Sequence, residues 1–186
     1  MENLNRKTVA ILATNGFEES ELSEPKKALE KAGATVEIVS LKSGEIKSWN
    51  DGDWGKNYKV DKTLEEVSQS DYNALMLPGG VINPDALRRD KNAVEFVKSF
   101  FENHKPVAAI CHAPWLLAEA GVLEGRTITS FNSIKTDMIN AGANWVDEEV
   151  VVDEGLVTSR NPDDLPAFNN KLVEEVYEGK HEAQTA

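Results

Sequence analysis

Cys111 is the only cysteine in the 186-residue chain, and it stands where a short apolar run gives way to a helix. The run Val107–Ile110 is typical of a buried parallel strand. Pro114 suits the first turn of the following helix, and Gly121 suits its end. A thiol at such a corner faces the free N–H groups of the helix, which favour the nucleophilic thiolate. A lone cysteine is more often a small buried hydrophobe, but this position and the adjacent His112 favour a reactive centre.

A second group of chemically active side chains follows the first predicted strand. Glu18 and Glu21 are three residues apart, so on a helical turn they share a face. Glu21, if it is aimed at the thiol, is expected to be protonated and to donate a hydrogen bond to sulfur, because burial and a nearby negative charge raise its pKa. Glu18 is then expected to be structural, paired with a cation or with backbone N–H groups. Glu19 is predicted to be an acid at a helix start.

A Pro-Gly-Gly turn ends a third apolar strand. The N–H groups of Gly79 and Gly80 carry no side-chain obstruction and could form an oxyanion hole, whereas the alternative is a tight turn that needs glycine dihedrals. His112 directly follows the nucleophile, so its ring must turn aside and be oriented by an acid if it is the general base. His104, at a helix end, and His181, in the tail, are expected to be solvated.

Apolar strands and amphipathic helices alternate along the chain. Strands are predicted at Thr8–Leu12, residues 36–41, Ala74–Leu77, Val107–Ile110, residues 127–130, and twice within residues 145–160 around an Asp-Glu-Gly turn. Helices are predicted at residues 20–32, 64–68, within 84–104, 115–120, 133–141 and from 161, with a loop or hairpin at 42–59. Alternation implies a mostly parallel sheet covered on both faces, whose ligands gather at the carboxyl ends of the strands. The three reactive turns should therefore meet.

The composition bounds the class of protein. The length suits one domain, assigned to residues 1–180, with a disordered tail at 181–186. A net charge of −12 argues against a nucleic-acid partner and against anionic membrane surfaces. A single cysteine excludes an internal disulfide and favours a reducing compartment. Without a signal-like apolar stretch, a cytoplasmic location is expected. Trp49, Trp54 and Trp115 are expected to pack rather than to line a pocket.

The chain resembles the ThiJ/PfpI family over nearly its whole length, and the PfpI general-stress branch more than the amidotransferases that share the fold. The resemblance rests on five motifs: Phe17-Glu18-Glu19-Ser20-Glu21-Leu22, Leu77-Pro78-Gly79-Gly80, Ala109-Ile110-Cys111-His112, residues 134–143, and residues 150–160 with Val150-Val151-Val152-Asp153 and Thr158-Ser159-Arg160. It implies an α/β fold of the flavodoxin-like kind, a three-layer sandwich with a mostly parallel sheet, helices on both faces and a small antiparallel hairpin.

The resemblance also implies roles for single residues. It makes Cys111 a nucleophile on a strained elbow, Glu21 the carboxyl group beside the sulfur, and Gly79 and Gly80 the oxyanion turn. Family members form homodimers, sometimes hexamers, in which an acid from a neighbouring subunit completes a Cys-His-acid triad. The matching position is Asp85, for which a first-turn helix acid is the alternative. No cofactor and no metal ion are expected. One departure is Ala113, where the branch usually has Gly, and a tighter pocket is expected from it.

Three functions fit these residues. The leading hypothesis is a stress-protective enzyme of the deglycase or glyoxalase kind, in which Cys111 attacks reactive carbonyls or early glycation adducts. The second is an intracellular cysteine peptidase acting on small peptides. The third is an oxidation sensor or chaperone without turnover, because an accessible thiolate beside a carboxyl group oxidises readily. The substrate is thus expected to be a small carbonyl compound or a peptide.

Overall fold

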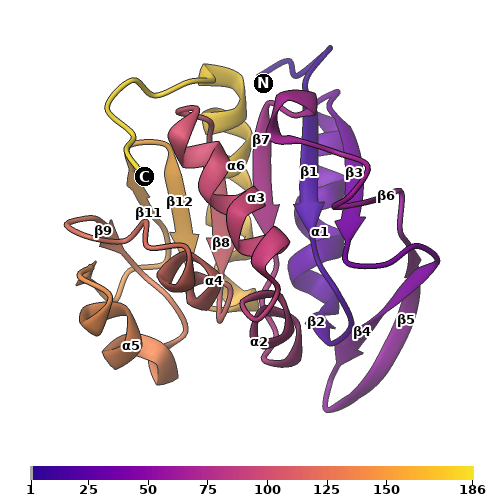
Figure 1. Cartoon of the computed structure of the whole chain (residues 1–186), viewed down its shortest axis with the longest axis horizontal. Coiled ribbons are helices and arrows are strands. Elements are labelled where there is room, and N and C mark those ends of the chain that lie inside the picture. Colours follow the sequence, from indigo (N-terminus) through magenta and orange to yellow (C-terminus); the bar gives the residue numbers. More distant parts are fainter. Residues whose placement is uncertain (1) are drawn as a thin grey trace.

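A seven-stranded sheet forms the middle layer of the molecule, and the computed structural model describes residues 2–186 (Figure 1). The strand order is β11-β12-β8-β7-β1-β3-β6. All neighbours are parallel except β11 and β12, which form an antiparallel pair at one edge. The bounds are β1 (Thr8–Leu12), β3 (Thr35–Ser40), β6 (Lys62–Thr63), β7 (Ala74–Leu77), β8 (Val107–Ile110), β11 (Val151–Asp153) and β12 (Leu156–Ser159).

Helices cover both faces of this sheet. In Figure 1, α2, α3 and α4 lie in front of it, while α1 and α6 lie together behind it. The two-residue strands β9 and β10 form a separate small sheet, which lies with the short helix α5 beside the edge strand β11 (Figure 1). The bounds are α1 (Glu19–Lys31), α2 (Ile82–Leu87), α3 (Lys91–Glu102), α4 (Pro114–Glu119), α5 (Lys135–Asn140), α6 (Leu165–Glu178), β9 (Thr127–Ile128) and β10 (Asn144–Trp145), with 3₁₀ turns at Gln69–Asp71, Asn132–Ile134 and Pro162–Asp164.

The central strands are apolar without interruption because both of their faces are buried. Along β1, Val9 and Ile11 enter the core beneath α1 and α6, whereas Ala10 and Leu12 enter the core beneath α3 and α4. Strands β7 and β8 divide their side chains between the two cores in the same way. The predicted three-layer, mostly parallel α/β sandwich is therefore confirmed.

The predicted loop or hairpin at residues 42–59 is a hairpin. Strands β4 (Glu45–Asn50) and β5 (Asp53–Lys59) pair antiparallel, and β2 (Phe17–Glu18) joins β4 to make a small second sheet. Trp49 and Trp54 meet edge to face across the hairpin, with ring centroids 5.5 Å apart. This hairpin projects beside α1, close to the carboxyl ends of the central strands (Figure 1).

Three predicted elements differ from the structure. Residues 64–68 form turns instead of a helix, because the Glu66 carboxylate bonds the N–H and hydroxyl groups of Thr63. The helix predicted within residues 84–104 is two helices, since Asp90 caps the N-terminus of α3 and so restarts the chain there. The strand predicted at residues 127–130 keeps only two residues, and these pair with β10 outside the central sheet.

The tail, which was expected to be disordered, makes contacts with the rest of the chain. The backbone N–H of His181 donates to the His104 carbonyl at 2.9 Å, and Gln184 is fully buried. The His104 ring contacts the Gln184 carbonyl, and the Arg126 guanidinium donates to the Thr185 carbonyl. Neither histidine is fully solvated. In residues 2–186, no helix is both long enough and apolar enough to cross a bilayer.

Candidate active site

Cys111 sits at the carboxyl end of β8 with a backbone φ of +64°, in the left-handed region that residues with a side chain rarely adopt. Two hydrogen bonds hold it there. Its N–H donates to the Ser159 carbonyl at 3.0 Å, and its carbonyl accepts from the Phe131 N–H at 2.9 Å. The neighbouring segments thus impose the strained elbow that the resemblance implied.

Glu21 reaches this elbow from α1 and is fully buried. Its Oε2 accepts a hydrogen bond of 2.9 Å from the Gly79 N–H, while its Oε1 is buried without a hydrogen-bond partner. Burial raises the pKa of Glu21 to about 8, and the nearby Glu18 carboxylate contributes. The Glu21 carboxyl group is therefore mainly protonated at neutral pH and can donate to the neighbouring sulfur.

The electrostatics of Cys111 differ from the expectation drawn from the strand-to-helix corner alone. The side chain is almost fully enclosed, and this burial raises the pKa of the Cys111 thiol instead of lowering it. The N–H groups of Gly80 and His112 act in the opposite direction, because they favour a negative charge on sulfur. A proton acceptor beside the thiol is therefore needed to activate it.

The two glycines of the predicted oxyanion turn have separate environments. The Gly79 N–H is already used by Glu21. A Cβ atom at Gly79 would lie 2.6 Å from Glu21 Oε2 and 2.7 Å from Cys111 Cβ, so the absence of a side chain permits this close approach. Gly80, at φ +75°, presents its N–H toward the sulfur. Gly80 and the backbone of His112 are therefore the donors near the reacting atom.

His112 supplies the proton acceptor. Its Nδ1 lies 3.1 Å from Cys111 Sγ, and its Nε2 lies 3.1 Å from the Ser133 hydroxyl. The ring stacks on Phe131, with centroids 4.7 Å apart and planes at 24°. Burial lowers the pKa of His112, so the imidazole is neutral at pH 7 and free to accept a proton.

Ser133 was not recognised in the sequence, although one signal was available. It follows the segment predicted as a strand at residues 127–130, and a hydroxyl at the carboxyl end of a strand is at the correct edge of an α/β sheet. Phe131, which also follows that predicted strand, was not recognised either. Both belong to the segment whose backbone also fixes the Cys111 carbonyl.

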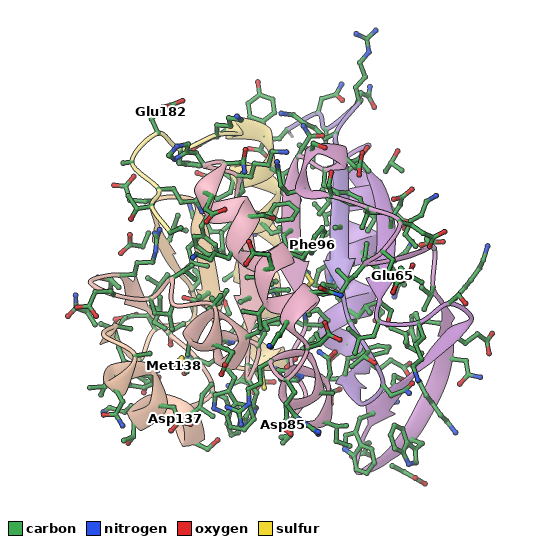
Figure 2. The ribbon with its side chains drawn as sticks, viewed as in Figure 1. Glu65, Asp85, Phe96, Asp137, Met138 and Glu182 are labelled. Carbon is green, nitrogen blue, oxygen red and sulfur yellow. The ribbon has the colours of Figure 1, made fainter. Side chains whose placement is uncertain are left out.

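Asp85 lies on α2 at the rim of the molecule (Figure 2). Its carboxylate accepts hydrogen bonds from Arg88 Nε at 3.1 Å and Arg88 Nη2 at 2.8 Å, and the Arg88 guanidinium lies over the Trp115 ring at 4.6 Å. The side chain of Asp85 is about half exposed. Its role toward a second subunit stays a prediction.

Of the other two acids, Glu19 lies in the first turn of α1, as predicted, and Glu18 directly precedes that helix. Glu18 lines the cavity beside Cys111, and its carboxylate accepts hydrogen bonds from the Ser20 hydroxyl, at 3.4 Å, and from the Ser20 backbone N–H. Burial raises the pKa of Glu18. Glu19 bonds the Ser48 hydroxyl at 2.7 Å and the backbone N–H of Lys56 at 3.1 Å, which anchors the β4–β5 hairpin to α1. Sequence spacing does not reveal that contact, since Ser48 and Lys56 are distant in the chain.

A cavity of about 430 Å³ opens above the sulfur. Besides the reactive groups, it is lined mainly by apolar side chains, which are Trp49, Val81, Ile82, Phe131 and Pro162. Trp49 thus lines the pocket in addition to packing against Trp54, as expected. Ala113 is buried in the core at a φ of −56° and does not line the cavity, so its methyl group fits without narrowing the pocket.

A buried cysteine on a strand-to-helix elbow of a mostly parallel sandwich, with a glutamate beside it, defines a DJ-1/ThiJ-like α/β protein. The model of the DJ-1/PfpI family matches residues 7–175, and the chain belongs to that family. It is 45% identical to General stress protein 18 of Bacillus subtilis over 168 residues, which are 90% of this chain and 96% of the relative.

Two further similarities extend the comparison. The chain is 44% identical to Protein/nucleic acid deglycase 2 of Escherichia coli over 168 residues, again 90% of this chain and 96% of the relative. Among solved structures, DJ-1beta of Drosophila melanogaster superimposes with a TM-score of 0.82 at 29% identity, covering 96% of this chain and 95% of that one.

Proposed function

We propose that the protein is a stress-protective enzyme that uses Cys111 to attack reactive dicarbonyls, or the early adducts these compounds form on amines and thiols. The names of the relatives, which include a general stress protein and a deglycase, support the stress-protective class. The observation that carries the proposal is the distance of 3.1 Å between Cys111 Sγ and the Nδ1 of a neutral His112. Thiol and acceptor are thus within proton-transfer distance.

The first step is proton transfer coupled to addition. The Cys111 proton moves to His112 Nδ1 as the sulfur adds to the aldehyde carbon, so a C–S bond forms and the C=O π bond opens. The resulting oxyanion lies near the N–H groups of Gly80 and His112, which stabilise it, and it then takes a proton. The protonated Glu21 donates to sulfur and helps it to leave at the end of the cycle.

The overall reaction balances without an external oxidant. Methylglyoxal and water give lactate, because the aldehyde carbon is oxidised while the adjacent ketone carbon is reduced. An early adduct on an amine is attacked at its carbinol carbon: the C–S bond forms as the C–N bond breaks, and the amine leaves with the proton that His112 took from Cys111. The remaining hemithioacetal then follows the same course. His112 moves the proton between the two carbons. A cavity of about 430 Å³ lined by apolar groups has room for a three-carbon dicarbonyl or a modified side chain.

The decisive experiment compares the protein with Cys111→Ser for lactate production from methylglyoxal in the presence of a chelator. The serine variant is expected to lose at least about a thousandfold in kcat/KM, since an unassisted hydroxyl is a far weaker nucleophile. Wild-type turnover by Cys111→Ser would end the proposal. A peptidase would give a different result: neither protein would produce lactate, and only the wild-type protein would release a fluorophore from short peptides.

A further inference from the structure

A compact group of possible metal ligands lies at the end of α6. Glu175, Glu178 and His181 each offer one ligand atom, and these atoms lie within 4.8 Å of one another. Glu175 is 5% exposed and His181 is largely enclosed, whereas Glu178 is exposed. The spacing is regular: each residue is three positions after the previous one, so the last turn of the helix and the residues after it carry all three.

The two enclosed members lack hydrogen bonds. Glu175 Oε2 and His181 Nε2 lie 2.8 Å apart, close enough for an ion pair when the ring is protonated, yet neither atom has a partner in hydrogen-bond geometry. A buried carboxylate oxygen and a buried imidazole nitrogen without partners are costly. A cation bonded to both atoms would satisfy them together.

The surroundings hold His181 in place. Its backbone N–H donates to the His104 carbonyl at 2.9 Å, and the Gly155 backbone packs against its ring so closely that a Cβ atom there would lie 2.7 Å from His181 Cδ2. The imidazole and the buried carboxylate are therefore fixed, and the exposed Glu178 is free to adjust.

We propose that Glu175, Glu178 and His181 form a binding site for one divalent transition-metal ion of the Zn²⁺ type. One imidazole nitrogen and two carboxylate oxygens are a ligand set that Zn²⁺ accepts, with bonds of about 2.0–2.2 Å and a water molecule as the fourth ligand. The ion clamps the tail to α6 and to the β11–β12 turn at Gly155. This role is structural, because the ion adds a cross-link between the tail and α6.

The site is distinct from the reactive cysteine. Helix α6 begins beside the cavity, which Pro162 lines, and its 14 residues extend about 21 Å away from it. In Figure 2, Glu182, next to His181, lies at the opposite end of the molecule from Asp85, which marks the cavity end. Failure of the proposed enzymatic function would therefore leave this proposal unaffected.

The test is calorimetric titration of Zn²⁺ into the full chain carrying Cys111→Ala, which removes the thiol as a competing ligand. We expect one ion per chain and a rise in Tm of about 5–10 °C at a hundredfold excess over Kd. Glu178 is exposed, so Glu178→Gln should leave the fold intact. It should weaken Zn²⁺ binding at least about tenfold, because loss of a metal ligand costs at least as much affinity as loss of a group that hydrogen-bonds to a ligand. His181→Asn should abolish binding.

The matched control is Glu182→Gln, which removes the same charge from an exposed neighbour outside the ligand set. It should bind Zn²⁺ as the parent does. The proposal is overturned if the parent takes up less than one ion per chain, if Glu178→Gln binds with unchanged affinity, or if Glu182→Gln weakens binding equally. Should His181→Asn fail to fold, the comparison of Glu178→Gln with Glu182→Gln still decides.

Discussion

Glu21 accepts the Gly79 N–H through Oε2 at 2.9 Å, and its other oxygen, Oε1, is buried without a hydrogen-bond partner. One oxygen is thereby fixed as an acceptor, and the other is available to carry the proton. Because burial raises the pKa of Glu21 to about 8, that proton is retained at neutral pH. The sulfur consequently faces a donor on one side and the acceptor His112 on the other.

The first prediction concerns the pH dependence of turnover. His112 must be neutral to accept the thiol proton, and its pKa lies below the ordinary 6.5, so kcat/KM should rise with pH through that acidic range. Glu21 must be protonated, so kcat/KM should fall as pH passes about 8. A bell-shaped profile for methylglyoxal turnover is expected, and Glu21→Gln, a permanent donor, should lose the alkaline limb. An alkaline limb that persists unchanged in Glu21→Gln contradicts this assignment.

The second prediction concerns stability. Glu21 ionises near 4.5 when unfolded and near 8 when folded. The folded state therefore binds this proton more tightly, and the resulting contribution to the free energy of unfolding is complete below pH 4.5 and is lost as pH rises through 8. Glu21→Gln lacks this dependence. The free energy of unfolding of the variant, relative to that of wild type, should therefore increase by roughly 1–4 kcal/mol from pH 5 to pH 9. Urea denaturation of both proteins at pH 5 and at pH 9 measures this difference between variant and wild type. The same difference at both pH values would refute the prediction.

Much of this site could be predicted from the sequence, because topology alone brings strand ends together. The apolar runs before Gly79 and Cys111 predict adjacent buried strands, and the helix after residue 18 brings Glu21 to the same edge. Patterns of hydrophobicity carry that information. They do not say which way a side chain or an N–H group points, so the separate environments of Gly79 and Gly80 could not be foreseen.

The remaining surprises depend on contacts between distant segments. Glu19 is an unremarkable helix acid until the β4–β5 hairpin brings Ser48 and Lys56 to it. The same hairpin turns Trp49 toward the cavity. The thiol pKa depends on how completely the folded chain encloses the sulfur, and no local pattern around Cys111 reports that quantity.

The third prediction concerns Ser133 as a positioning residue. Its hydroxyl lies 3.1 Å from His112 Nε2, and by accepting the Nε2 proton it would favour the tautomer in which the Nδ1 facing the sulfur is unprotonated. Ser133→Ala should lower kcat by about three- to tenfold with KM nearly unchanged and should shift the acidic limb of the pH profile, whereas Ser133→Thr should restore both. A loss of Tm without any change in the pH profile would indicate that Ser133 only supports packing.

The fourth prediction concerns Asp85, which the resemblance assigns to a triad shared between subunits. Within one chain its carboxylate pairs with Arg88. If a second subunit brings Asp85 to His112, Asp85→Asn should lower kcat by about 10²-fold or more, because a neutral amide stabilises the imidazolium poorly. Arg88→Gln is the matched control, since it removes the intrachain partner and leaves the carboxylate. Sedimentation shows whether each variant keeps its oligomeric state. Equal kcat in Asp85→Asn and wild type would leave Asp85 as a surface helix acid, with Ser133 the only polar side chain bonded to His112 Nε2 in the described chain.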